Sequence, residues 1–110
     1  LAAEFAHLQP FPEPPFGRNG HWFSGFWYDG PDTALCDAFR RHMNEAGVDL
    51  RPFWKPIHLQ LPYQAALATP MPVADGLWQR LFPLPCSTHL SDAELTQVTK
   101  AARAFWAANS

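Results

Sequence analysis

The sequence predicts an α/β fold, an α+β-like two-layer sandwich in which a small sheet of about three strands packs against helices. Three observations predict it. The 110 residues are 47% hydrophobic and 16% charged, as in one packed domain with a single core. Helical patterns alternate with short runs typical of strands, and caps or turn residues separate them. We therefore expect residues 1–110 to form a single domain without internal repeats.

The N-terminal part of the sequence predicts a helix tail and a loop. Ala2, Ala3, Glu4 and Phe5 favour a helix, so we expect residues 1–9 to be the tail of a preceding helix and the chain to be a fragment. Residues 10–20, PFPEPPFGRNG, contain four prolines and two glycines and predict a surface loop.

A strand and a helix are expected next. HWFSGFWYD, residues 21–29, is rich in aromatic residues and predicts a strand covered on both faces, with Gly25 marking the close approach of a helix. In residues 30–50, Asp32 or Thr33 caps a helix that Gly47 ends. Its apolar stripe is Leu35, Phe39 and Met43, opposite a polar face of Asp37, Arg40, Arg41 and Glu45.

The second half predicts two more strands and three helices. Val48, Leu50 and Phe53 alternate as in a strand that leaves the sheet at Pro52. YQAALA at 63–68 favours a short helix, PVADGLWQRLF at 72–82 favours another with Val73, Leu77 and Leu81 on one face, and FPLP favours a brief strand. The last helix, in 90–110, has the capping box Ser91 and Glu94 and a buried stripe of Leu95, Val98, Ala102 and Phe105.

Composition excludes several classes of function. The net charge of −2 supplies no field for nucleic acid, and no apolar run approaches the ~20 residues that span a membrane. Residues 1–20 do not have the basic-then-apolar layout of a signal peptide, and a disulfide between Cys36 and Cys86 is possible but not needed, so reduced thiols and a cytoplasmic location are expected.

Catalytic and metal-binding motifs are also missing from the sequence. It has no phosphate-binding glycine loop, and its histidines, at 7, 21, 42, 58 and 89, do not have metal-ligand spacing. The scattered carboxylates are typical of solvated helix faces. We therefore expect neither a catalytic residue nor a metal site in these 110 residues.

RPFWKPIHLQ, residues 51–60, is the exception. Two prolines stiffen it and remove two amide donors, so it predicts an extended loop that holds side chains in place. Arg51 and Lys55 suit phosphate or carboxylate oxygens, Trp54 suits the face of a base or sugar, and His58 suits a hydrogen bond. The alternative is structural: Phe53 and Trp54 plug the core, Lys55 points to water and His58 is a satisfied, half-buried histidine.

RPFWKPIHLQ, then PVADGLWQRLFPLP, then LSDAELTQV, in this order, resemble the C-terminal part of the DegT/DnrJ/EryC1/StrS family of pyridoxal-phosphate-dependent sugar aminotransferases. The W-K-P-x-H core is the most specific feature, and PPFGRNGHWF is similar to the family's entry into its first strand. The resemblance covers nearly the whole chain, but only the small domain of such an enzyme.

The resemblance implies a homodimeric enzyme of fold type I that transfers an amino group from glutamate to a nucleotide-linked keto sugar in amino-sugar and polysaccharide biosynthesis. The small domain then shapes the substrate cleft, with His58, Lys55 and Trp54 near it and Arg51 a weaker candidate. The family attaches pyridoxal phosphate to a lysine of an N-terminal domain that is missing here. We therefore expect no cofactor and no activity from this fragment alone.

Two departures and one alternative accompany the resemblance. Only Lys55 and Lys100 are present, at positions that the family does not use for the cofactor, and Cys86 replaces a commoner serine. The alternative to an aminotransferase domain is a stand-alone interaction module, derived from that domain, that binds a partner through Phe23, Trp27 and Trp54.

Overall fold

A central antiparallel sheet organises the computed structural model, which describes residues 1–20 and 22–109. The strands are β1 (Leu8–Pro10), β2 (Ser24–Tyr28) and β3 (Leu81–Leu84), in the order β1-β2-β3. Leu8 pairs with Tyr28, and Phe26 pairs with Phe82. The helices are α1 (Ala34–Glu45), α2 (Pro72–Leu77) and α3 (Asp92–Ala108).

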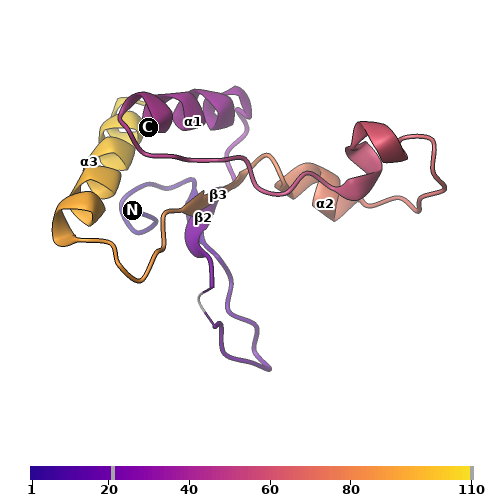
Figure 1. Cartoon of the computed structure of the whole chain (residues 1–110), viewed down its shortest axis with the longest axis horizontal. Helices are drawn as coiled ribbons and strands as arrows, with labels where there is room; N and C mark the ends of the chain where they lie inside the picture. Colours follow the sequence, from indigo (N-terminus) through magenta and orange to yellow (C-terminus); the bar gives the residue numbers. More distant parts are fainter. Residues whose placement is uncertain (21, 110) are drawn as a thin grey trace.

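One face of the sheet and two helices form the core (Figure 1). Phe26 and Tyr28 lie two residues apart on β2 and therefore point to the same face, toward Phe39 of α1 and Trp106 of α3. The Tyr28 and Trp106 rings stack with centroids 5.3 Å apart, and Phe39 meets Phe82 edge to face at 5.0 Å. This arrangement confirms the expected two-layer α/β fold.

The central strand, β2, is less buried on one face than the sequence predicts. β2 lies between two neighbours, as its aromatic residues predict, but Trp27 on the second face is only half-buried. The close approach at Gly25 comes from the backbone carbonyl of Phe82 on β3 and not from a helix, because a Cβ there would collide with that oxygen. His21, in the expected strand, and Ser110, in the expected last helix, lie outside the described residues.

One N-terminal segment and one central segment differ from the sequence prediction. Residues 2–7 form turns instead of a helix tail, and Leu8–Pro10 becomes the edge strand β1, because its backbone pairs with β2. No strand forms over 48–53. Val48 and Leu50 are buried, but the Asn44 side chain accepts the Leu50 N–H at 3.1 Å and donates to the Leu50 carbonyl at 3.3 Å, so these groups are not available to a sheet.

The helix boundaries confirm most of the capping signals. Gly47 has φ of 76°, and Ser91 and Glu94 form the complete capping box of α3. Asp32, rather than Thr33, uses its side chain, accepting the Ala34 N–H at 3.0 Å.

The predicted helix faces need three corrections. Arg40 of α1 is buried rather than solvated, because it reaches across to the return of the chain near β3. On α3 Leu95 is exposed, since the core lies under the later turns at Ala101 and Trp106. α2 ends at Leu77, Leu81 belongs to β3, and Val73 is exposed because no core lies beneath this helix.

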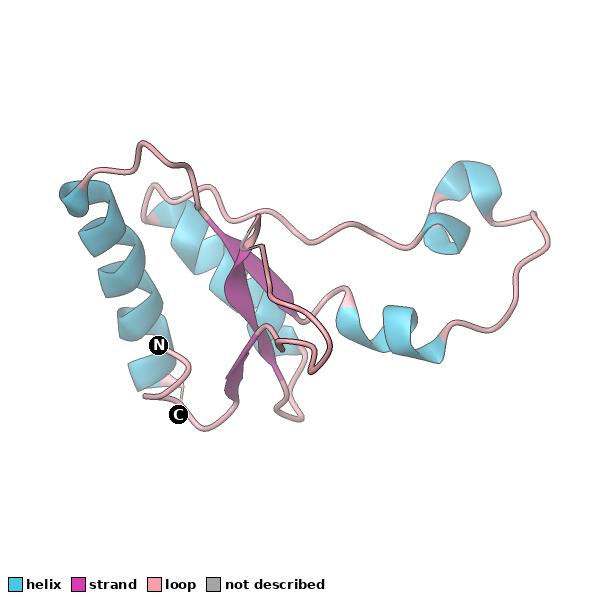
Figure 2. Ribbon diagram, turned by 90° about the horizontal axis from the view of Figure 1, so that it is seen from below, coloured by secondary structure: helices cyan, strands magenta, loops and turns pink. Residues whose placement is uncertain are grey.

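Residues 51–80 leave the sheet and helices as a projecting arm (Figure 2). The arm contains two 3-10 turns, Ile57–Leu59 and Leu61–Tyr63, and α2. The helix expected at 63–68 does not form, because the second turn ends at Tyr63 and residues 64–68 continue as a turn, a bend and irregular chain. The chain measures 47 × 33 × 27 Å with a radius of gyration of 15.3 Å. A compact domain of this length has about 13 Å, so the arm makes the molecule elongated.

Candidate functional site

The candidate site is a groove of about 710 Å³ in the arm. Trp54 and His58 line it from the outgoing chain, Tyr63 and Leu67 from the tip, and Met71 from the returning chain. Its walls are therefore mostly apolar and aromatic, the composition that small-molecule pockets favour.

The local sequence shapes the outgoing wall. Residues 51–56 are irregular and extended, as Pro52 and Pro56 predict, and Pro56 has φ of −49° and ψ of 138°. The chain then closes a 3-10 turn, in which the Leu59 N–H donates to the Pro56 carbonyl at 3.0 Å. This turn brings His58 back toward α2.

His58 bonds to the protein through its Nε2 atom. Nε2 lies 2.7 Å from the Asp75 carboxylate, and the side chain is only 17% exposed. Nδ1 is buried and has no hydrogen-bond partner in the described part of the chain. In this arrangement the ring forms part of the groove wall. It is half-buried, as the structural alternative expects, but it is not fully satisfied, because Nδ1 has no partner among the described residues.

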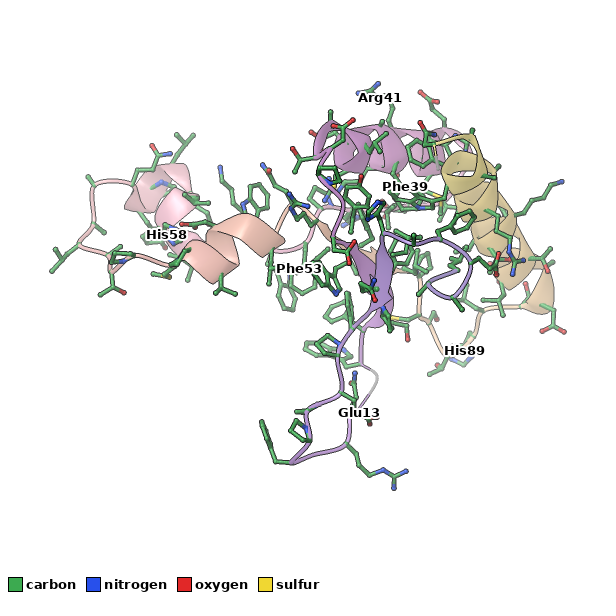
Figure 3. All side chains as sticks on the ribbon, turned by 180° about the vertical axis from the view of Figure 1, so that it is seen from behind. Glu13, Phe39, Arg41, Phe53, His58 and His89 are labelled. Carbon is green, nitrogen blue, oxygen red and sulfur yellow. The ribbon has the colours of Figure 1, made fainter. Side chains whose placement is uncertain are left out.

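Trp54 is available to a ligand. It is 65% exposed, so it does not plug the core as the alternative reading expects. Its ring meets Phe23 edge to face at 5.4 Å, lies 5.3 Å from Phe53, and lies 6.3 Å from Trp22. Figure 3 labels Phe53 where the arm meets the sheet and His58 farther out. The cluster therefore supports one end of the groove at the root of the arm.

The two cations of the motif lie outside the groove lining. Lys55 Nζ lies over the Trp78 ring, 5.8 Å from its centroid, and Arg51 is exposed and pairs with Asp49 at 2.9 Å. The structure therefore brings Trp54 and His58 together in the groove but does not bring Arg51 or Lys55 into it.

Sequence reasoning missed the partners on the returning chain. Asp75 and Trp78 contact His58 and Lys55, and Tyr63 and Met71 complete the groove. These contacts join residues 17 and 23 positions apart, and no local pattern indicated them.

Other chemistry has little support in the described residues. No group of three or more histidine, cysteine, aspartate or glutamate side chains there is placed to hold a metal ion. Cys36 and Cys86 are free thiols, and burial raises the pKa of the Cys36 thiol, which opposes its reactivity. Across residues 1–20 and 22–109, no helix has the length and apolar character needed to cross a bilayer.

Fold and site together define a small two-layer α/β domain whose apolar groove lies on a projecting arm. The sequence model of the DegT/DnrJ/EryC1/StrS aminotransferase family matches residues 4–103. The chain therefore belongs to this family, and the resemblance drawn from its motifs is confirmed. Searches of curated proteins and of solved structures found no match.

Members of this family are in general pyridoxal-phosphate-dependent, but the groove does not fit that cofactor. Pyridoxal phosphate needs a lysine for covalent attachment and a charged partner for its ring nitrogen. The groove lining holds neither a lysine nor a carboxylate. Lys55 packs over Trp78, and Lys100 is exposed on α3. We therefore derive no cofactor chemistry from these residues.

Proposed function

We propose that the chain is the small C-terminal domain of a pyridoxal-phosphate-dependent aminotransferase, in which it forms one wall of the substrate cleft. The family match over residues 4–103 carries this proposal. The reaction is the transfer of an amino group from glutamate to the keto group of a nucleotide-linked sugar, as in amino-sugar and cell-surface polysaccharide biosynthesis.

The groove supports a substrate of this kind. Aromatic faces such as that of Trp54 stack on the apolar face of a sugar or on a nucleobase, and each such contact with a base contributes about 1–3 kcal/mol. Trp54 and His58 are the proposed wall residues. Lys55 and Arg51 lie on the outgoing part of the arm, outside the groove lining, and the charge of Lys55 would attract the diphosphate of a nucleotide sugar, whereas Arg51 is paired with Asp49.

The surface of the arm supports docking onto a further domain. Seven of the ten exposed large hydrophobic side chains of the described residues are on the arm: Trp54, Ile57, Leu61, Tyr63, Leu67, Met71 and Val73. Such a concentration is unusual for a free surface and marks an interaction site. In the proposal an N-terminal, cofactor-binding domain and the second subunit of a homodimer cover it.

The cellular location is part of the same proposal. The thiols of Cys36 and Cys86 are free, and unpaired cysteines in one small domain are typical of a reducing compartment. We therefore propose a cytoplasmic enzyme.

The first test is the mass of the gene product from its source cells, detected with an antibody to this domain. The proposal expects a protein several times heavier than 12.4 kDa, with a pyridoxal absorbance that borohydride fixes to a lysine outside residues 1–110. A native product of 12.4 kDa without that absorbance would instead support the stand-alone interaction module.

The second test addresses the groove. In the full-length enzyme, Trp54→Ala should raise KM for the nucleotide sugar about tenfold, because a lost stacking contact costs about 1–3 kcal/mol. Leu95→Ala is the control, since Leu95 is an exposed residue of α3 that lies neither on the arm nor in the groove lining. Equal KM values in both variants would show that the groove is not part of the substrate site.

A further inference from the structure

Two cross-links join the outgoing limb of the arm, residues 51–60, to its returning limb, residues 72–80. The first is the 2.7 Å hydrogen bond between His58 and Asp75, and the second is the cation–π contact of Lys55 with Trp78. In the part of the chain that the structure describes, no other hydrogen bond joins these two limbs. Among the described residues, these two side-chain contacts are therefore the polar links between the limbs.

The spacing of the cross-links is regular. Lys55 and His58 are three residues apart on one limb, and Asp75 and Trp78 are three residues apart on the other, in α2 and at its C-cap. The limbs run in opposite directions, so the first residue of one pair meets the last of the other. Residues three apart lie on one face of a helical turn, and for this reason both contacts form on the same side of α2.

We infer that Asp75 and Trp78 are positioning residues, which hold His58 and Lys55 and thereby set the width of the groove. The groove is lined from both limbs, by Trp54 and His58 on the outgoing limb and by Ala74 on the returning limb, with Met71 directly before it. Separating the limbs moves these walls apart. The consequence for substrate rests on the proposed function, but the cross-links themselves do not.

The Asp75 carboxylate also selects the form of the His58 ring. An ionised carboxylate only accepts hydrogen bonds, so the Nε2 atom beside it must carry the hydrogen. In the neutral ring Nδ1 then has no hydrogen, and Nδ1 is the buried atom without a partner in the described residues. Asp75 thus fixes both the orientation of the ring and its tautomer.

The test is nitrogen-15 NMR of the histidine rings in the 110-residue chain, in alkaline buffer where free imidazole is neutral. The wild type should show His58 as a single Nε2–H tautomer. Asp75→Ala should give the mixed tautomers of a free imidazole. It should also make amide exchange in residues 57–63 and 72–78 about fivefold faster, as for the loss of one hydrogen bond of about 1 kcal/mol.

Two further variants separate positioning from a general loss of structure. Asp75→Glu keeps an ionised carboxylate, which only accepts hydrogen bonds, so it should retain the Nε2–H tautomer. Asp49→Ala removes an exposed aspartate that pairs with Arg51 at the root of the arm, and it should leave the His58 signals unchanged. Near-ultraviolet circular dichroism of the stacked Tyr28 and Trp106 confirms that each variant keeps its core.

His58 signals in Asp75→Ala that match those of the wild type would overturn the inference, and so would unchanged amide exchange in both limbs. The measurements need neither substrate nor cofactor. Their failure is therefore distinguishable from a failure of the proposed aminotransferase function, which the mass and KM experiments test.

Discussion

Single residues connect parts of this chain that are distant in sequence. Glu4 accepts hydrogen bonds from Arg103 Nε and Nη2 at 2.9 and 2.8 Å and so ties the N-terminal turns to α3. Arg40 reaches from α1 to the carbonyl of Gln79 and stacks over Phe82, 5.0 Å from the ring centroid. One of these contacts is exposed and the other buried, so we expect different consequences from breaking each.

The ion pair between Glu4 and Arg103 should have a measurable effect at acid pH. Hydrogen bonding to the Arg103 guanidinium lowers the pKa of Glu4 from 4.5 to about 2. Because the folded pKa is the lower one, the stabilising contribution is present above pH 4.5 and is lost as the pH falls through about 2. Carbon-13 NMR titration of the Glu4 carboxyl should show this midpoint. Arg103→Ala should return it toward 4.5, whereas Lys100→Ala, one turn earlier on α3, should not.

Arg40 should matter far more than its neighbour Arg41. Arg40→Ala leaves the Gln79 carbonyl without this donor and removes the packing on Phe82, so we expect a loss of about 2 kcal/mol in the free energy of unfolding. Arg41 is exposed on the same helix, and Arg41→Ala should change stability by less than about 0.5 kcal/mol. Urea denaturation of the two variants measures the difference, and similar midpoints would contradict the anchoring role of Arg40.

At the scale of elements, two glycines have opposite roles. Gly47 ends α1 in the left-handed region, with φ of 76°, where a side chain is strained. Gly76 lies inside α2, and nothing is within 4 Å of the position where a Cβ would be. The first glycine is therefore required by its backbone, and the second only weakens a helix.

Alanine substitutions should separate these two roles. Gly47→Ala should lower the free energy of unfolding by about 1 kcal/mol. Gly76→Ala should not lower it, and should increase the helicity of the arm, since alanine favours a helix by about 1 kcal/mol over glycine. Thermal unfolding followed by circular dichroism tests both. A stabilised Gly47→Ala would show that the left-handed turn is not needed to end α1.

Local signals predicted the elements whose hydrogen bonds are local. The capping box at Ser91 and the glycine at 47 placed the helix ends correctly, because each acts within a few residues. The alternation of Val48 and Leu50 predicted a strand wrongly. Val48 and Leu50 are buried at the two-residue spacing of a strand, but the backbone of Leu50 is hydrogen-bonded to the Asn44 side chain and not to a neighbouring strand. β1 was missed because a three-residue strand is defined by its partner, β2, and not by its own residues.

The candidate site was likewise predictable only where its features are local. Two prolines predicted a stiff, extended loop over residues 51–60, and the structure has it over 51–56, before the 3-10 turn at Ile57–Leu59. The exposed Trp54 was a residue that the sequence singled out. The roles of Asp75 and Trp78 depend on the fold of the arm, which brings together residues 17 and 23 positions apart. No local pattern specifies such a contact.

At the scale of the whole molecule, the arm separates the stable part of the chain from its interaction surface. The core aromatic residues lie between the sheet and α1 and α3, whereas the arm keeps its apolar side chains exposed. We therefore expect the chain on its own to associate through the arm.

Polar substitutions at the tip should reduce this association without unfolding the core. Leu61 and Leu67 are almost fully exposed, so the double variant Leu61→Gln and Leu67→Gln removes apolar surface from the tip. Dye binding and the sedimentation coefficient at high concentration should fall, and the melting temperature should stay within about 2 °C. A strictly monomeric wild type that binds no dye would contradict the expected docking surface.

The way in which the arm is attached has a consequence for how its length and sequence can vary. α1 holds both ends of the arm, because Asn44 bonds to Leu50 and Arg40 bonds to Gln79. Arg80 adds hydrogen bonds to the carbonyls of Tyr28 and Gly30. With its ends fixed in this way, the segment between them is an insertion that can change in length and sequence at little entropic cost. The sheet and the helices α1 and α3 can therefore stay as they are when the tip of the arm, between the W-K-P-x-H core and α2, changes.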